Sequence, residues 1–64
     1  MEFRGSIVKE TREEQGYKQY YFAQMTGISQ PHISKIENGK SLPTLPELIT
    51  ISVFLERPLG HFVS

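Results

Sequence analysis

The segment GISQPHISKIENGK, residues 27–40, places polar side chains of several kinds at helical spacing. If Ile33, Ile36 and Glu37 point inward, the opposite face carries an amide, a proline ring, a hydroxyl and an ammonium group. These outward residues are Gln30, Pro31, Ser34 and Lys35. An amide can pair with an adenine edge, an ammonium group with guanine, a hydroxyl with either, and a proline can contact a thymine methyl group. The segment is therefore a candidate for reading base edges in a DNA groove, the alternative being an ordinary solvated surface.

Length and composition limit what can support this segment. A chain of 64 residues forms one domain, residues 1–64, and buries only about 60% of its unfolded surface. Cysteine is absent, so neither disulfides nor zinc–thiolate sites can stabilise the fold. The formal net charge of zero gives no overall attraction to nucleic acid, so DNA binding must rest on a local patch. The longest apolar-rich run, residues 48–55, is too short to cross a bilayer, and we expect a soluble cytoplasmic protein with no membrane partner.

Glycines and prolines divide the chain into short helical segments. Thr44, with Glu47 three residues later, is typical of a capping box at a helix start. The predicted helices cover about residues 4–14, 19–26, 29–38, 45–55 and 58–62. Because strand alternation is not sustained anywhere, the sequence predicts an all-α, compact five-helix bundle.

The second and third predicted helices have the apolar spacing of two packed helices joined by a tight turn. Ala23 must be small because the two helices cross closely there, and Gly27 can end the second helix in a left-handed conformation. Ile28 fills the space beneath the turn, while Ile33 and Ile36 hold the third helix against the second. The spacing by itself predicts a packed helix pair and nothing more.

Several stretches along the chain together follow the pattern of one known family. They are GSIVKETREEQG, Gln19, FAQMTGIS, ISKIENGK and LPTLPELITISVFLERPLGHF. On these stretches, residues 5–62 resemble the Cro/repressor helix-turn-helix family, also called the xenobiotic-response-element type. The resemblance implies a lambda-repressor-like bundle whose third helix enters the major groove of DNA. Two positions depart from the family pattern. Thr26 replaces a larger apolar residue, which predicts a slightly thinner core, and Lys18 replaces a serine or threonine N-cap.

Polar groups around the third helix could bind DNA phosphates. They are Lys18, Gln19, Asn38, Gly39 and Lys40, and the resemblance implies this role for Gln19, Asn38 and Lys40. Lys18 in place of an N-cap costs about 1 kcal/mol of capping energy and puts a cation at the positive end of the helix dipole. Beside a phosphate the same ammonium group is favourable. We therefore expect Lys18 to lower stability and raise DNA affinity.

One charge in this region is expected to point inward. The family pattern implies that Glu37 pairs with Arg12, near the end of the first helix. Such a partly buried pair would tie the first helix to the third, and loss of one partner would cost about 3 to 5 kcal/mol. We interpret Arg12 as structural, the alternative being a direct DNA contact.

The last two predicted helices contain more apolar residues than one buried face requires. The residues expected to point inward are Leu45, Leu48, Ile51, Leu55, Leu59 and Phe62. Those left partly outside, as a candidate partner surface, are Ile49, Val53, Phe54 and Val63. Because related repressors pair through this end, we expect a homodimer that places two reading helices about 34 Å apart. The alternative is that this surface packs against another protein or an additional C-terminal domain.

The chain contains few of the residues that catalytic and metal sites use. His32 and His61 are the only histidines, and there is neither cysteine nor aspartate. A metal site or a Ser-His-Asp arrangement therefore lacks its residues, and we expect no enzyme activity, no metal and no cofactor. His32 either contacts a phosphate or has no role, and His61 belongs to the surface of the last turn.

The sequence predicts a transcriptional regulator that binds double-stranded DNA sequence-specifically, with repression favoured, as a dimer on a palindromic operator. Two alternatives stay open. One is an antitoxin or protein-interaction module that uses the apolar surface, and the other is the N-terminal DNA-binding domain of a larger sensing regulator. Steep salt dependence of binding would distinguish DNA binding from protein interaction.

Overall fold

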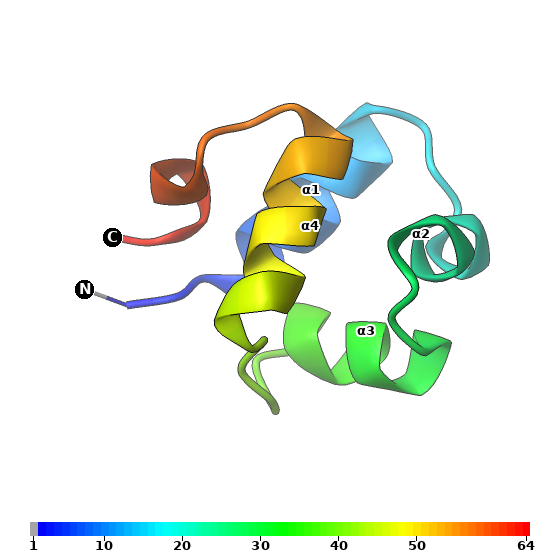
Figure 1. Cartoon of the computed structure of the whole chain (residues 1–64), viewed down its shortest axis with the longest axis horizontal. Helices are drawn as coiled ribbons and strands as arrows, with labels where there is room; N and C mark the ends of the chain where they lie inside the picture. Colours follow the sequence, from blue (N-terminus) through cyan, green and yellow to red (C-terminus); the bar gives the residue numbers. More distant parts are fainter. Residues whose placement is uncertain (1) are drawn as a thin grey trace.

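The computed structural model describes residues 2–64, in which four short α-helices precede a 3-10 turn. The elements are α1 (Gly5–Glu14), α2 (Gln19–Thr26), α3 (Gln30–Glu37), α4 (Leu45–Leu55) and the turn η1 (Leu59–Phe62). In Figure 1, α4 crosses in front of α1, α2 lies on the right, and α3 lies across the bottom. The two chain ends lie near each other on the side away from α2. α3 packs against both α1 and α2, so its position is set by two neighbours.

The all-helical architecture expected from the sequence is confirmed, but the fifth predicted helix is only a 3-10 turn. The first four helices begin and end within one residue of their expected bounds. In the last turn, the His61 N–H donates to the Pro58 carbonyl three residues back, at 2.9 Å. A four-residue segment that contains Gly60 has too few residues and too little helix propensity to build an α-helical ladder.

The two ends of the chain pair with each other, a contact that the sequence did not indicate. Phe3 and Val63 form an isolated antiparallel bridge. Beside it, Glu2 and Ser64 exchange two backbone hydrogen bonds of 2.9 and 2.8 Å. The bridge is the only extended pairing within residues 2–64, and it holds the end of η1 beside the start of α1.

One apolar cluster joins all the elements. Its buried members are Val8, Phe22, Ala23, Ile28, Ile33, Ile51, Leu55 and Phe62. The expected inward positions of the helix pair are therefore confirmed. Thr26, which was expected to thin the core, is half-buried, and its hydroxyl donates to the Phe22 carbonyl at 2.8 Å. The hydroxyl thus replaces an apolar contact with a local hydrogen bond.

Two of the leucines expected to point inward are exposed instead. Leu45 is the first residue of α4 and lies one turn before Ile49 on the solvent side of the helix, opposite the face that buries Ile51. Leu59 opens the η1 turn, which reaches the core only through Phe62. The prediction for Leu45 was wrong because α4 has one buried face and the sequence offers apolar residues on two, and the prediction for Leu59 was wrong because Phe62 is the residue of η1 that is buried.

Two glycines determine how α3 meets its neighbours. Gly27 ends α2 at a φ of 74°, the left-handed conformation expected for this turn. Gly5 begins α1 directly against the end of α3, where a Cβ atom would overlap the Ile36 carbonyl oxygen. α1 can therefore approach α3 only because residue 5 has no side chain.

Candidate nucleic-acid interface

Helix α3 has one buried and one solvent-facing side. Ile33, Ile36 and Glu37 are buried, as their spacing predicted. At the start of the helix, the Ser29 hydroxyl accepts the His32 N–H at 3.3 Å, which satisfies one of the donors that the first turn leaves free. The helix is thereby held at its N-terminus and along its inner side, and this sets the direction of its outward side chains.

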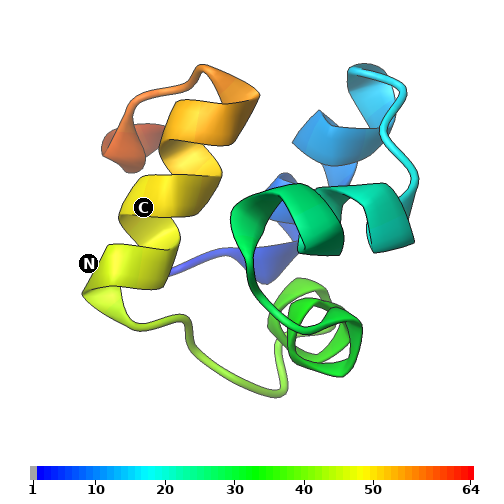
Figure 2. The same ribbon diagram turned by 45° about the vertical axis from the view of Figure 1, so that its right-hand side comes forward.

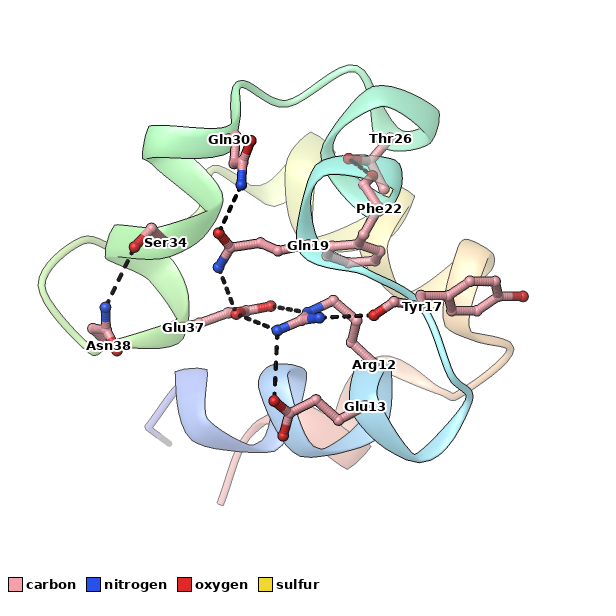
Figure 3. Close-up of polar contacts among 10 residues, drawn as sticks. All are labelled: Arg12, Glu13, Tyr17, Gln19, Phe22, Thr26, Gln30, Ser34, Glu37 and Asn38. Carbon is pink, nitrogen blue, oxygen red and sulfur yellow. Dashed lines mark hydrogen bonds and ion pairs between the residues drawn. The ribbon is translucent and has the colours of Figure 1, made fainter.

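The solvent-facing strip contains the four residues expected to read bases. Gln30, Pro31 and Lys35 are exposed, whereas Ser34 is half-buried. In Figure 3, Asn38 lies beside Ser34, and its Nδ2 atom donates to Ser34 Oγ at 3.4 Å. Gln30 and Lys35 are therefore the accessible polar groups of the strip, with Ser34 set deeper.

An ion pair beneath α3 connects it to α1. Arg12 Nε donates to Glu37 Oε2 at 2.8 Å, and Arg12 Nη2 donates to Glu37 Oε1 at 3.1 Å. Arg12 Nη1 donates to the Tyr17 carbonyl at 2.7 Å, so each of its three nitrogens has an acceptor. Only 6% of Arg12 and 4% of Glu37 is exposed. The pair implied by the family pattern is thus present, with the two-bond geometry of strong charge-assisted contacts.

Two glutamines extend this ion pair to the surface (Figure 3). Gln19 Nε2 donates to Glu37 Oε1 at 3.0 Å, and Gln30 Nε2 donates to Gln19 Oε1 at 3.2 Å. The hydrogen bonds run without a break from the buried guanidinium of Arg12 to the exposed amide of Gln30. Linked hydrogen bonds of this kind polarise and strengthen one another. Gln30 therefore presents its carbonyl oxygen and its remaining N–H in a defined direction.

The candidate phosphate-binding groups lie at helix ends. Lys18 precedes α2 and provides no side-chain cap. At the end of α3, the Lys40 N–H donates to the Lys35 carbonyl at 2.8 Å and the Gly39 N–H to the Ile36 carbonyl at 3.2 Å, the two bonds of a Schellman motif. The exposed members of the set are Lys18, Asn38, Gly39 and Lys40. Gln19 is half-buried, and its amide orients Gln30, a task that the sequence did not indicate.

The local charge of this region differs from the zero net charge of the chain. Glu37 is the only acidic residue in residues 29–41, and Arg12 neutralises it in the interior. Lys35 and Lys40 are therefore the exposed charges of α3 and of the turn that follows it. A polyanion that approaches this strip meets cations and amides, with no exposed carboxylate in the same segment.

One contact of α3 had no signal in the sequence. His32 Nε2 lies 3.1 Å from Glu47 Oε1, across 15 residues. Glu47 forms the expected capping box of α4, since its Oε1 accepts the Thr44 N–H at 2.9 Å and its N–H donates to Thr44 Oγ1 at 3.2 Å. The Thr44 N–H first, and then His32, hold the pKa of Glu47 below its usual value. The capping box could be predicted from its spacing, whereas the histidine contact depends on the tertiary fold.

The apolar surface of α4 differs in detail from the expected set. Ile49 and Val53 are 44% and 70% exposed, and Leu45 extends the same row at 64%. We call these three residues, spaced four apart, the α4 row. Phe54 and Val63 are half-buried, because Phe54 packs in an aromatic cluster with α2 and Val63 belongs to the terminal bridge.

The other histidine contacts α1, since His61 Nε2 lies 3.2 Å from Thr11 Oγ1. In the part of the chain that the structure describes, no three His, Cys, Asp or Glu side chains come together as a possible metal site. Across residues 2–64 there is also no helix with the length and apolar character needed to cross a membrane.

Known proteins share both the sequence pattern and the fold. The helix-turn-helix family description matches residues 8–62. The ImmF control region 10 kDa protein of Bacillus phage phi105 is 34% identical over 56 residues, which cover 88% of this chain and 62% of the phage protein. The chain thus spans about three fifths of the length of that relative.

Solved structures give the same result. SinR from Bacillus subtilis, a master regulator for biofilm formation solved in complex with DNA, has a TM-score of 0.86 at 25% identity, with 92% of this chain and 98% of that chain covered. The P22 c2 repressor in complex with a synthetic operator has a TM-score of 0.90 at 20% identity, with 100% and 97% covered. The chain therefore belongs to the Cro/repressor type of the helix-turn-helix family.

Proposed function

We propose that this chain is a cytoplasmic transcriptional regulator, a repressor, that binds double-stranded DNA sequence-specifically through α3. The observation that carries the proposal is the unbroken line of hydrogen bonds from Arg12 through Glu37 and Gln19 to Gln30. A glutamine that served only solubility would need no such support, whereas one that reads a base edge must be held in place. SinR, which was solved in complex with DNA, supports the same role.

The base-reading residues are those of the outward strip. Gln30 pairs with an adenine edge, Lys35 donates to guanine, and Pro31 contacts a thymine methyl group. Ser34 is set deeper and bonded to Asn38, and it contributes a hydroxyl to the base that lies between those contacted by Gln30 and Lys35. Each good pair discriminates against the wrong base by about 1 to 3 kcal/mol.

Phosphate contacts determine the register of α3 in the major groove. The groups that provide them are Lys18, Gln19, Asn38, Gly39 and Lys40. Lys18 places its ammonium group beside the uncapped N-terminus of α2, so the two attract the same anion. Because these contacts go to the DNA backbone, they contribute affinity but no sequence preference.

The salt dependence of binding tests this function. If a dimer neutralises roughly eight phosphates, log affinity falls against log salt concentration with a slope near −7. Lys40→Ala should reduce the magnitude of the slope by about one per bound protomer. Arg57→Ala is the matched control, because Arg57 follows the end of α4 that points away from α3 (Figure 1) and should leave the slope unchanged. A slope near zero for the wild-type protein contradicts DNA binding.

The regulator acts as a homodimer on a palindromic operator. The α4 row, together with the half-buried Phe54 and Val63, forms the contact between two copies, because a row of exposed apolar side chains is covered favourably by an identical row. Two reading helices then lie about one helical turn of DNA apart, about 34 Å. An inverted repeat with that spacing follows from the two-fold symmetry.

The same α4 row supports a second candidate function, a protein-interaction module of the antitoxin kind. In that case the row holds a different protein, and the α3 strip is not required for activity. A further alternative is a DNA-binding domain within a larger sensing regulator. Binding to a protein partner through an apolar surface lacks the steep salt dependence given above. Measuring affinity against salt concentration therefore distinguishes a protein-interaction module from a DNA-binding regulator.

A further inference from the structure

His32 and Glu47 connect the first turn of α3 to the first turn of α4. Their Nε2 and Oε1 atoms lie 3.1 Å apart, and 31% and 27% of the two side chains are exposed. Within residues 2–64, Glu47 is the only carboxylate within ion-pair distance of His32. The contact is therefore open enough to exchange protons with water and short enough to be an ion pair when the imidazole is protonated.

The His32–Glu47 contact joins α3 to the end of the connection that leads from α3 to α4. The connection, residues 38–44, is the open loop at the end of the molecule where α3 lies (Figure 2). It begins at the Schellman motif of α3 and ends at the capping box of α4. His32 contacts the same Glu47 oxygen that accepts the Thr44 N–H. His32 therefore ties the far end of the connection back to the start of α3.

Glu47 is also the only ionised partner that the surrounding elements offer to His32 among residues 2–64. α2 contains no charged residue. The charge that α1 directs toward α3 is Arg12, which Glu37 holds. On α3 itself, Lys35 lies one turn further along. The one charged partner of His32 in this part of the chain is thus a carboxylate of α4.

We infer that His32 is a positioning residue for DNA binding, which holds the connection 38–44 through Glu47 and makes DNA affinity depend on protonation of the imidazole. This role rests on the proposed function, because the connection contains Lys40 and the other phosphate-binding groups that follow α3. Histidine titrates within about pH 5 to 8. Across that range Glu47 stays ionised, because the Thr44 N–H and His32 lower its pKa. Protonation adds an ionic attraction to Glu47 that holds the connection in place, so affinity rises as the pH falls.

The test measures the Kd of the whole chain for one selected duplex between about pH 5.5 and 7.5, at constant ionic strength. The variants are His32→Gln, Glu47→Gln and, as the matched control, His61→Gln, which removes the other histidine. A glutamine at position 32 keeps the backbone N–H that donates to Ser29 Oγ, and a glutamine at position 47 keeps an oxygen for the Thr44 N–H, so both variants retain their helix caps. Circular dichroism on the same samples measures their folding.

Wild type and His61→Gln should bind about two- to fivefold more tightly at the lower pH, the range expected for an exposed ion pair. His32→Gln and Glu47→Gln should lose this dependence. A pH dependence that persists in both variants, or that disappears with His61 instead, overturns the inference and leaves the proposed function standing. If the wild-type protein selects no duplex at any pH, the proposed function and this inference both fail.

Discussion

Helices α3 and α4 follow each other in the chain and expose opposite kinds of side chain. Both bury aliphatic residues in the common core. On the outside, α3 presents Gln30, Pro31 and Lys35, whereas α4 presents the apolar α4 row. The two surfaces also differ in what lies beneath them, because the polar line from Arg12 to Gln30 supports only α3.

The two surfaces differ in what a single chain provides: the polar groups beneath α3 are paired within the chain, whereas the α4 row is exposed. Every buried side-chain nitrogen and oxygen in residues 2–64 has a hydrogen-bond partner, so the polar groups beneath α3 are satisfied without a ligand. The α4 row leaves apolar area in water, and each Å² that a partner covers contributes about 25 cal/mol. α3 is therefore preorganised for a polar ligand, while α4 gains stability only from contact with protein.

Removing the support beneath α3 should have the largest effect. Arg12→Ala leaves Glu37 as a buried charge without its partner, and we expect the free energy of unfolding to fall by about 3 to 5 kcal/mol. Urea denaturation followed by circular dichroism measures the change. Lys9→Ala, at an exposed position of the same helix, is the control and should change stability by less than about 0.5 kcal/mol. A stable Arg12→Ala protein that simply fails to bind DNA would show that Arg12 is a contact residue.

The close approach of α1 to α3 gives the next largest effect. Gly5→Ala drives a methyl group into the Ile36 carbonyl, and we expect a loss of about 1 to 3 kcal/mol as the two helices separate. Gly60→Ala is the matched control, because a Cβ atom at that position meets nothing within 4 Å. Equal melting temperatures for the two variants would mean that α3 does not depend on this contact.

Lys18→Ser should change stability and binding in opposite directions. A serine N-cap on α2 raises the free energy of unfolding by about 1 kcal/mol, while loss of the ammonium group removes a phosphate contact and weakens DNA binding. Thermal denaturation and a binding titration on the same preparation report both changes. Tighter DNA binding by the variant would rule out a phosphate contact at this position.

Changing the α4 row should have the smallest effect on the folded monomer. Val53→Glu, at a position 70% exposed, should alter the free energy of unfolding by less than about 0.5 kcal/mol and abolish self-association. Thr50→Glu adds the same charge to an exposed position of α4 outside the row and is the control. Sedimentation over a range of concentrations distinguishes the two, and a wild-type protein that is monomeric at high concentration argues against the dimer.

Local patterns in the sequence were sufficient for the helices and for the inward side of α3. Gly27 and the Thr44 capping box mark helix ends through the chemistry of a few adjacent residues, and Ile33 and Ile36 mark a buried face through their spacing. These signals depend on the chain within one or two turns. They are therefore readable before the tertiary structure is known.

Contacts between distant segments were not readable in this way. The Phe3–Val63 bridge and the His32–Glu47 contact join residues that no helical or strand spacing relates. The requirement for glycine at position 5 arises from the backbone of another helix. The line through Gln19 to Gln30 was missed for the same reason, although both residues were singled out for other roles.

The most direct test of a preorganised base-reading α3 is selection from random double-stranded oligonucleotides by the wild-type chain and by Gln30→Ala. The wild-type chain should enrich one inverted-repeat sequence, and Gln30→Ala should lose about 1 to 3 kcal/mol of preference at a single position of each half-site while unfolding at an unchanged temperature. The absence of any enriched sequence with the wild-type chain, or an unchanged sequence preference with Gln30→Ala, would contradict the account.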